Sequence, residues 1–446
     1  MAEREELLTG WGRTAPTAAH VCRPHTAEEV AAAVVAAGPR GILARGLGRS
    51  YGDAAQNAGG SVLDLARLDT ISSVDPVTAE VTCGAGVSID ALLHRTVPFG
   101  WFVPVTPGTR QVTLGGAVAA DVHGKNHHRD GSLGAHVTRL ELVDGSGERR
   151  TLTPADPLFQ ATVGGLGLTG VITSVTVRMI AVGSAWLGVD TTRTASLEDT
   201  MSTLAECDGR SRYSVAWIDC LARGGALGRG VVTAGDHLGA GDVAGGGDNP
   251  LAFAPRARAV APRHVPAGVL GPRRMALFNA AYHRAAPRHA VAVPTHAAAF
   301  FHPLDVLDRW NRLYGPGGFL QYQFASPDPR VVRRVLEGFR SARVPGLLAV
   351  LKRFGPAGAA PLSFPLAGWT LAVDVPARTP GLATALDAAD RLVLDSGGRV
   401  YLAKDARTAP EMVEAMYPRL PEWREVRSAA DPRGVFTSDL ARRLRL

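Results

Sequence analysis

Residues 44–53 read Ala-Arg-Gly-Leu-Gly-Arg-Ser-Tyr-Gly-Asp, a glycine-rich turn that directly follows a short apolar run. A second glycine-rich segment contains Pro-Gly-Thr at 107–109, Val-Thr-Leu-Gly-Gly-Ala-Val at 112–118 and Asp-Val-His-Gly-Lys-Asn-His-His at 121–128. Glycine lets backbone amides approach a phosphate closely and lets the chain adopt positive φ. Strand-like runs separate the two segments, so together they predict two loops that hold one diphosphate group.

Short strands and helices alternate over residues 20–180. Thr26 is suited to be the N-cap of a helix over 26–37, and Glu29 occupies the capping-box position. A hairpin with an Asp-Gly turn is expected over 140–152. We expect further strands at 41–45, 61–65, 80–87 and 171–179, and a helix that starts at Ser88.

The character of the chain changes near residue 180. Residues 222–274 are rich in Gly, Ala, Pro and Arg and lack periodic apolar spacing, so they predict a long mobile loop or lid. Order is expected to resume near residue 298. There we expect strands around 321–324, at 347–354 and at 369–375, and helices at 330–342, at 380–396 and within the tail.

The hexapeptide Gly165-Leu-Gly-Leu-Thr-Gly170 matches the pattern G-x-G-x-x-G. A dinucleotide fingerprint follows a strand and opens a helix. Here a helical pattern precedes the glycines and a β-branched strand follows them, so we reject a Rossmann site. Residues 44–53 also lack the G-K-S/T ending of a P-loop.

Composition argues against several functional classes. With 46% hydrophobic and 20% charged residues the chain can build substantial cores, and no apolar run is long enough to span a membrane. The acidic N-terminus lacks a signal core, and the four cysteines show no C-x-x-C spacing, so a cytoplasmic location is expected. The net charge of +7 permits an anionic partner. No nucleic-acid signature accompanies the arginines, so peripheral association with a membrane is the better interpretation.

Of the 48 Lys and Arg residues, the lysines are Lys125, Lys352 and Lys404 alone. Lysine is a compact charge whose pKa shifts readily on burial, whereas guanidinium stays charged. Each lysine lies in a polar or turn-like stretch within apolar surroundings, which makes the three candidates for a site. His123 and its neighbours at 127 and 128 crowd Lys125, but no carboxylate or cysteine completes a ligand set, so no metal is expected.

Six motifs of the chain are long and ordered. They are R-G-L-G-R-S-Y-G-D from Arg45, P-G-T-R-Q-V-T-L-G-G from Pro107, D-V-H-G-K-N-H-H from Asp121, G-L-T-G-V-I from Gly167, F-L-Q-Y-Q-F from Phe319 and Y-L-A-K-D-A-R-T from Tyr401. Together they resemble the family of decaprenylphosphoryl-β-D-ribose 2-oxidases of actinobacterial cell-wall synthesis, within the vanillyl-alcohol-oxidase, or PCMH, type of FAD flavoproteins. The resemblance runs from Leu8 to Leu444, and residues 185–300 match poorly.

The resemblance implies an α+β fold in three parts. These are a PCMH-type, two-part FAD-binding domain at 1–182, a substrate domain at 183–397 with an antiparallel sheet and flanking helices, and a C-terminal segment at 398–446 that returns to the FAD domain. By motif match, the expected FAD-binding residues are Ala44, Arg45, Gly46, Leu47, Gly48, Arg49, Ser50, Tyr51, Gly52, Asp53, Ala54, Gly108, Thr113, Leu114, Gly115, Gly116, Ala120, Asp121, Val122, His123, Ile172 and Tyr401. Superfamily members that bind FAD covalently carry histidine where this chain has Arg49. Arginine cannot form that bond, so non-covalent FAD is expected.

The resemblance also implies a reaction. The 2-hydroxyl of a ribose carried on polyprenyl phosphate is oxidised to a keto sugar as hydride passes to the flavin, and a short-chain NADH-dependent reductase then completes epimerisation to arabinose. Lys404 is the expected base, with Tyr51 and His123 as alternatives. The expected substrate-binding residues are Lys125, Gln321, Gln323, Lys352 and Lys404. The family is assigned to the periplasmic face of the plasma membrane, which leaves the location of this chain open.

Two positions depart from the family pattern. Ala372 stands where the family commonly carries cysteine, and Thr370 stands where it carries asparagine. Loss of the thiol predicts insensitivity to thiol-modifying inhibitors, and the loss of one amide donor bears on substrate identity. Three alternatives therefore stay open: a soluble carbohydrate or aldonolactone oxidase, a non-catalytic flavin-binding or membrane-docking protein, and an oxidase of another ribosyl intermediate in specialised metabolism.

Overall fold

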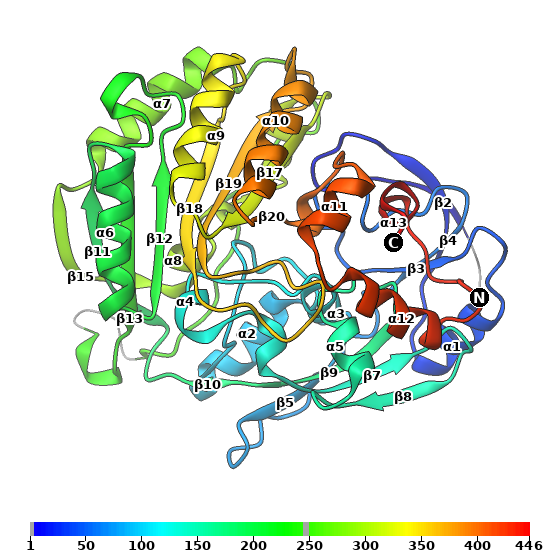
Figure 1. The fold of residues 1–446 in the computed structure, drawn as a ribbon. Coiled ribbons are helices and arrows are strands. Elements are labelled where there is room, and N and C mark those ends of the chain that lie inside the picture. The colour runs from blue at the N-terminus through cyan, green and yellow to red at the C-terminus, as the bar shows by residue number, and fades with distance from the viewer. Residues whose placement is uncertain (1–3, 244–248) are drawn as a thin grey trace.

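The computed structural model describes residues 4–243 and 249–446. Its architecture is α+β, as expected, with two four-stranded sheets and one eight-stranded sheet (Figure 1). In Figure 1 the eight-stranded sheet and its helices form one half of the molecule, and the two smaller sheets with the C-terminal helices form the other. None of the helices in the described ranges is long and apolar enough to cross a membrane.

The first small sheet carries the first glycine-rich loop. Its strand order is β1-β2-β4-β3, in which β3 and β4 run parallel and β1 is antiparallel to β2. Their bounds are β1 Arg4–Leu8, β2 Thr17–Cys22, β3 Ile42–Arg45 and β4 Ser61–Asp64. Helix α1, Ala27–Val35, begins as predicted, because the Thr26 hydroxyl accepts a 3.2 Å hydrogen bond from the Glu29 amide.

The second small sheet is antiparallel, in the order β5-β9-β7-β8. Its strands are β5 Glu80–Gly84, β7 Val137–Val143, β8 Arg149–Leu152 and β9 Val171–Arg178, and the pair β6 Trp101–Phe102 and β10 Ile180–Ala181 lies apart from it. The accompanying helices are α2 Ile89–Thr96, α3 Leu114–Ala119, α4 His127–Asp130 and α5 Pro157–Thr162. The hexapeptide at 165–170 joins α5 to β9, so it follows a helix and precedes a strand, which confirms that it is not a Rossmann fingerprint.

The large sheet is antiparallel throughout, in the order β15-β11-β13-β12-β18-β19-β17-β20. Its strands are β11 Trp186–Arg193, β12 Tyr213–Ile218, β13 Gly230–His237, β15 His289–His296, β17 Phe319–Ser326, β18 Leu348–Phe354, β19 Gly368–Pro376 and β20 Arg399–Val400. Helices α6 Leu197–Arg210, α9 Arg330–Ser341 and α10 Leu382–Asp395 cover one face and bury the largest core cluster against it (Figure 1). The opposite face is left to meet the glycine-rich loops.

The expectation of one long loop over 222–274 is wrong in part. Strand β13 lies within it, between β11 and β12, and helix α7, Pro272–Ala285, begins before it ends. The apolar core of β13 is only Val-Val-Thr-Ala between glycines, so its ladder depends on partners distant in sequence. A short parallel pair joins β14, Ala259–Val260, to β16, Leu307–Asp308. The part of the predicted loop at 244–248 lies outside the described residues.

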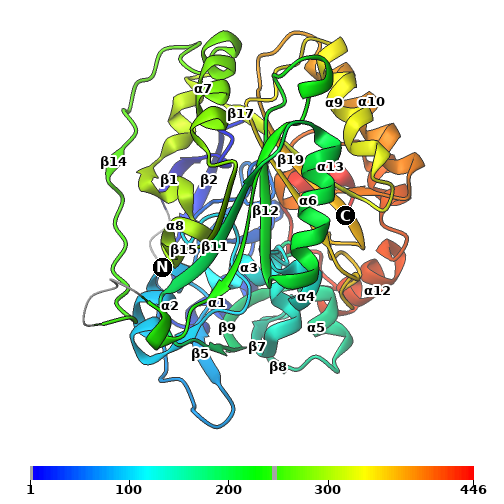
Figure 2. The ribbon, with the colours of Figure 1, turned by 90° about the vertical axis from the view of Figure 1, so that its left-hand side faces the viewer.

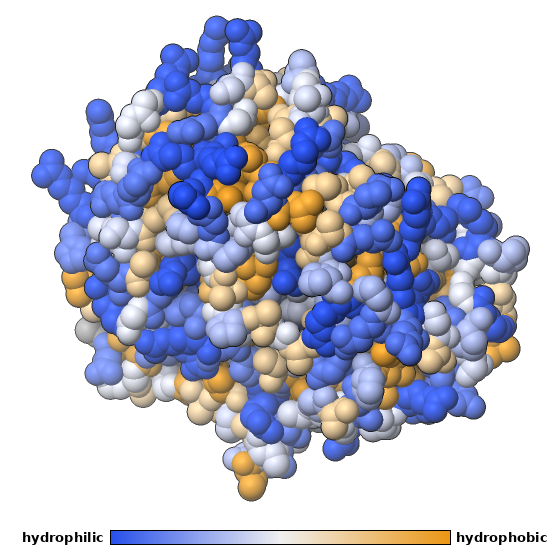
Figure 3. Space-filling view, in the orientation of Figure 1, coloured by the Kyte–Doolittle hydropathy of each residue, from blue (hydrophilic) through white to orange (hydrophobic). Residues whose placement is uncertain are grey.

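The C-terminal segment packs back on the first half of the chain. It contains α11 Pro410–Met416, α12 Leu420–Ala430 and α13 Asp439–Leu444. The Trp423 indole donates a 2.9 Å hydrogen bond to the Ala161 carbonyl, and the Arg443 guanidinium binds the Asp53 carboxylate at 2.8 Å. Hydrophilic side chains predominate on the face shown in Figure 3, with hydrophobic ones in small groups between them.

Candidate active site

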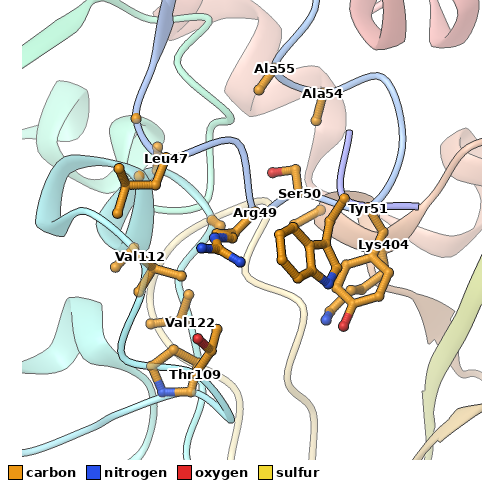
Figure 4. Close-up of a pocket in the computed structure, with 18 of the residues that line it drawn as sticks. Leu47, Arg49, Ser50, Tyr51, Ala54, Ala55, Thr109, Val112, Val122 and Lys404 are labelled. Carbon is orange, nitrogen blue, oxygen red and sulfur yellow. The ribbon is translucent and has the colours of Figure 1, made fainter. Parts of the chain in front are cut away.

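One cavity brings the two glycine-rich segments and the large sheet together. Residues 44–51 line it from the turn after β3, and 107–109, 112–113 and 115–117 line it from the second segment. The opposite wall consists of Gln321, Gln323, Leu348, Val350, Lys352, Ala372, Tyr401 and Lys404. Figure 4 shows the Arg49 side chain between the Leu47 and Val112 side of this cavity and the corner formed by Tyr51 and Lys404.

The first glycine-rich loop has the donors that an anionic group requires. The backbone amides of residues 46–50 donate no hydrogen bond to any described residue, and all five residues line the cavity. A Cβ on Gly46 would lie 2.1 Å from the Thr113 hydroxyl oxygen, so glycine is what allows the two segments to meet. Gly48 has a φ of 62°, in the left-handed region that favours glycine. This loop therefore fits a diphosphate.

The second glycine-rich segment is mostly satisfied within the protein. The amides of Leu114 and Gly115 donate to the carbonyls of Val87 and Ala85, at 2.8 and 2.9 Å. The Gly116 amide donates to the Thr113 hydroxyl, which caps α3. The amides of residues 108, 109, 112 and 113 donate to no described residue, and all four residues line the cavity. The second segment thus supplies shape, apolar walls and a second set of free donors.

Five of the expected site residues do not line this cavity: Gly52, Asp53, Leu114, Asp121 and Lys125. The Asp53 carboxylate is held by Arg443, and the Asp121 carboxylate accepts hydrogen bonds from the Ser132 hydroxyl at 2.7 Å and the Gly134 amide at 3.0 Å. Leu114 is fully buried in the core beneath the second sheet. These residues shape the loops from behind.

Lys125 is turned away from the other two lysines. Its ammonium group donates to the Phe300 carbonyl and lies 4.2 Å from the centre of the Phe300 ring. Burial, and then the charge of Lys352, lowers the pKa of Lys125 to about 7. Nothing in its sequence neighbourhood indicates this orientation, because alternate residues of an irregular turn can point either way.

Lys404 forms the reactive corner of the cavity. It lies in a short 3-10 turn after Tyr401, and its ammonium nitrogen stands 3.7 Å from the centre of the Tyr51 ring (Figure 4). Burial lowers the pKa of Lys404 to about 7, although the carboxylate of Asp374 acts to raise it. An amine with this pKa exchanges a proton near neutrality, which an ordinary lysine does not.

Asp374, on β19, is a site residue that the sequence analysis missed. It is fully buried, and its carboxylate accepts hydrogen bonds from the Gln321 amide at 2.6 Å and the Tyr314 hydroxyl at 3.0 Å. The same Gln321 amide lies 3.3 Å from the Tyr51 hydroxyl oxygen. Burial raises the pKa of Asp374 to about 6, while the bond from Gln321 opposes that rise. The one sequence signal was a lone carboxylate inside the apolar run of β19.

His123 is held as a neutral imidazole. Its Nε2 lies 3.0 Å from the Gln323 amide nitrogen, which makes that ring nitrogen the acceptor, and its buried Nδ1 has no partner among the described residues. Burial, then the charge of Lys352, lowers the pKa of His123 well below its usual value. The ring packs 4.8 Å from Phe354 and 5.2 Å from Tyr401, centre to centre. The unpartnered Nδ1 is a donor available to a bound group.

Lys352 and the two departures from the family pattern lie on neighbouring strands. The Lys352 ammonium, 3.3 Å from the Gly124 carbonyl, lines the cavity from β18, and burial lowers its pKa to about 8. Thr370 accepts a 3.2 Å hydrogen bond from Gln323, and Ala372 lines the cavity between Gln323 and Val350. The other two histidines of the cluster contact backbone groups instead: His127 accepts from the Gly355 amide, and His128 lies 3.1 Å from the Ser211 carbonyl.

Aromatic residues close the cavity beyond the first loop. The Arg49 guanidinium lies 3.9 Å from the Trp11 ring centre, and Trp11 meets Trp310 edge to face at 5.8 Å. Both tryptophans line the cavity, as does Leu304. Leu166, Gly167 and Gly170 line it too, so the segment rejected as a Rossmann fingerprint still contributes to the wall.

Comparison with known proteins gives two family matches. Residues 18–153 match the family model described as an FAD binding domain, and residues 378–444 match the model described as D-arabinono-1,4-lactone oxidase. The first match covers the first glycine-rich loop and the whole second segment. The second covers α10 and the C-terminal segment with Lys404.

Three relatives differ in how much of the chain they resemble. The decaprenylphosphoryl-beta-D-ribose oxidase of Mycolicibacterium smegmatis is 43% identical over 98% of this chain and 97% of its own length. A protein of Streptomyces coelicolor described as uncharacterized is 42% identical over 81% of this chain and its own full length. The alditol oxidase of a Streptomyces species is 33% identical over 39% of this chain and 41% of its own length.

Proposed function

This chain belongs to the family of the FAD-dependent decaprenylphosphoryl-β-D-ribose oxidases, and we propose that it oxidises the 2-hydroxyl of polyprenylphosphoryl-β-D-ribose to the 2-keto sugar. The observation that carries the proposal is the single cavity lined both by the unpaired amides of the first loop and by Lys404, Tyr51 and Gln321, with the buried Asp374 bound to Gln321. Identity to the mycobacterial relative along nearly the whole chain supports the same substrate class.

FAD binding is assigned to the two glycine-rich segments. The amides of 46–50 suit the diphosphate, and Val112, Val122 and Ile172 offer apolar contacts to the ring system. When bound, the flavin supplies the hydride acceptor. Attachment through a histidine in the first glycine-rich loop is not possible, because this chain has Arg49 at that position, and the Nε2 of His123 is engaged by Gln323. We therefore assign non-covalent FAD.

Lys404 is assigned as the base that takes the hydroxyl proton of the sugar. Its pKa of about 7 leaves a substantial fraction of neutral amine at physiological pH. Tyr51 is less suited, because burial raises the pKa of its phenol well above the usual value. His123 is less suited, because its Nε2 is engaged by Gln323. Lys404→Ala is expected to keep FAD and to lose turnover at least about a hundredfold; a variant with bound FAD and wild-type turnover would refute this role.

Substrate binding is assigned to Lys352, Gln321 and Gln323, which line the same cavity from β18 and β17, the two strands on either side of β19. The Lys352 ammonium suits the substrate phosphate, and the glutamines suit sugar hydroxyls. Lys125 is assigned a supporting role, because its charge is turned toward Phe300. The proposed domain limits remain 1–182, 183–397 and 398–446, with β20 of the last part paired to β17 of the second.

The keto sugar requires a second enzyme to complete epimerisation, and a short-chain NADH-dependent reductase fits that step. We also propose a peripheral position on the plasma membrane, since the substrate is carried on a lipid. The decisive experiment is anaerobic bleaching of the bound flavin by polyprenylphosphoryl ribose and by free sugars. Bleaching by the lipid-linked ribose, and not by free ribose or arabinono-lactone, is expected.

A second candidate is a soluble aldonolactone or alditol oxidase. The match of 378–444 to the arabinono-lactone oxidase model and the partial identity to an alditol oxidase favour it. That function predicts peroxide formation with a free sugar or lactone under air, and flavin that lipid-linked ribose leaves oxidised. The same bleaching series separates the two functions.

A further inference from the structure

Residues 249–304 have as large a positive net charge as the whole protein. Residues 249–304 contain seven arginines and neither aspartate nor glutamate, while the formal net charge of the complete chain is +7. Elsewhere, arginines are interspersed with carboxylates, and many of them form ion pairs. This stretch therefore creates a local positive field that no acidic neighbour in sequence offsets.

The same region exposes large apolar side chains. Of the thirteen strongly exposed large hydrophobic residues in the described part of the chain, eight lie between residues 260 and 306. Leu277 and Phe278 of α7 are 74% and 58% exposed, and Tyr282 stacks beside Phe278. By contrast, the face in Figure 3 bears mainly hydrophilic side chains. Apolar groups in such density on a charged surface mark an interaction site.

Helix α7 is oriented so that this surface faces outward. Its inner side is fixed by Asn279, whose amide donates a 3.0 Å hydrogen bond to Asp219, and by His283, 2.9 Å from the Thr194 carbonyl. Residues four apart share a helix face, so the opposite face presents residues 274, 277, 278, 281 and 285. That face combines Arg274 with Leu277 and Phe278, which is the composition of helices that lie in a membrane interface.

The surface also extends to the entrance of the cavity. The segment that carries β14 runs beside residues 303–308, and Figure 2 shows this segment and α7 along one side of the molecule. Leu304, which lines the cavity, is itself 36% exposed, and Val306 beside it is 44% exposed. Exposed apolar groups thus run from the surface to the cavity wall.

We propose that α7 and the β14 segment dock this protein onto the surface of an anionic lipid bilayer. The arginines attract the lipid headgroups, and Leu277, Phe278 and Val260 enter the acyl boundary. This inference rests on the proposed function for its purpose, which is to bring the cavity to a substrate held in the membrane. A bilayer is favoured over a protein partner because residues 249–304 contain arginines and neither aspartate nor glutamate. In a specific protein complex, complementary charges of both signs fix the orientation of the partner.

The test is sedimentation of the FAD-loaded full chain with vesicles of phosphatidylcholine alone or mixed with phosphatidylglycerol. Wild type is expected to bind the mixed vesicles and to be released by high salt. Leu277→Asp with Phe278→Asp is expected to weaken binding at least about tenfold, and Arg273→Glu with Arg274→Glu to weaken it by about as much. Phe99→Asp, at a residue 71% exposed elsewhere, is the matched control and should bind as wild type.

Equal binding of all variants, or equal binding to both vesicle types, would overturn the proposal. Light scattering provides a further arm: a wild-type dimer that the α7 variants convert to monomer, without any vesicle binding, would assign this face to a second copy of the chain. Melting temperature and flavin content verify that each variant is folded. Because vesicle binding requires no turnover, its failure is distinct from failure of the flavin-bleaching assay.

Discussion

The buried pair of Asp374 and Lys404 makes a quantitative prediction for the variant Asp374→Asn. The carboxylate is the one neighbour that acts to raise the pKa of Lys404 against burial and the charge of Lys352. The two groups do not form an ion pair within 4.0 Å. At an effective dielectric constant of about 20, two unit charges more than about 4 Å apart attract by at most about 4 kcal/mol, or about three pKa units. Removal of the charge should lower the pKa of Lys404 from about 7 by up to that amount.

The assay is the pH dependence of kcat/KM for lipid-linked ribose. If neutral Lys404 is the base, wild-type activity rises with pH through about 7, and this limb should move to lower pH in Asp374→Asn. The plateau should fall, because a weaker base accepts the proton less readily. Gln321 and Tyr314 also donate to different oxygens of Asp374, and asparagine keeps only one of them, a loss of about 1 to 3 kcal/mol. The apparent values belong to the coupled pair, so the shift between variants is the informative quantity.

The control is Asp390→Asn. Asp390 is also a buried carboxylate with a raised pKa, but it pairs with Arg407, and neither residue lines the cavity. It should leave the low-pH limb in place. If Asp374→Asn binds FAD and substrate but keeps the wild-type limb, then Asp374 does not set the protonation of Lys404. If both variants shift the limb equally, the shift reports general destabilisation and the reasoning fails.

Three further outcomes follow from the same cavity. Lys352 has a pKa of about 8 in the folded state, below the value near 10.4 of a free lysine, so between these values the folded state binds fewer protons than the unfolded state. The free energy of unfolding should therefore rise with pH across that window, by up to about 1.4 kcal/mol per pH unit. Lys352→Met should flatten this slope in urea titrations at several pH values. Acid precipitation should release all the flavin, since Arg49 cannot bond to it, and yellow washed protein would contradict this. Ala372→Cys should acquire a mass adduct with a thiol-modifying inhibitor of the family pocket, whereas the wild-type chain should acquire none there.

Local patterns predicted those parts of the fold that depend on local chemistry. Thr26 caps α1 because its hydroxyl reaches an amide three residues away, and the glycine-rich turn after β3 needs positive φ at Gly48. The alternation of Gln321 and Gln323 on β17 placed both in one cavity, as the period of a strand requires. Strand β13 was missed because its four-residue apolar core becomes a strand only between β11 and β12.

Side-chain direction in irregular segments was not predictable. Lys125 and His123 are two residues apart in the same glycine-rich turn, yet His123 lines the cavity and Lys125 is held by Phe300. Asp374 was missed for a related reason: its role comes from Gln321 and Tyr314, which are more than fifty residues away in sequence.

The structure also gives a physical reason for keeping lysine at these positions in a chain that otherwise uses arginine. Guanidinium stays protonated at any pH a protein meets, so an arginine at 404 could attract a charge but never accept a proton. Burial lowers the pKa of an ammonium group because it disfavours the charged form. At Lys404 the carboxylate of Asp374 opposes this effect, and the pKa is about 7. At Lys352 burial alone lowers the pKa, to about 8, so this lysine is charged more often at pH 7 than Lys404 is. One lysine is therefore suited to exchange a proton and the other to hold an anion, and this division depends on where Asp374 lies.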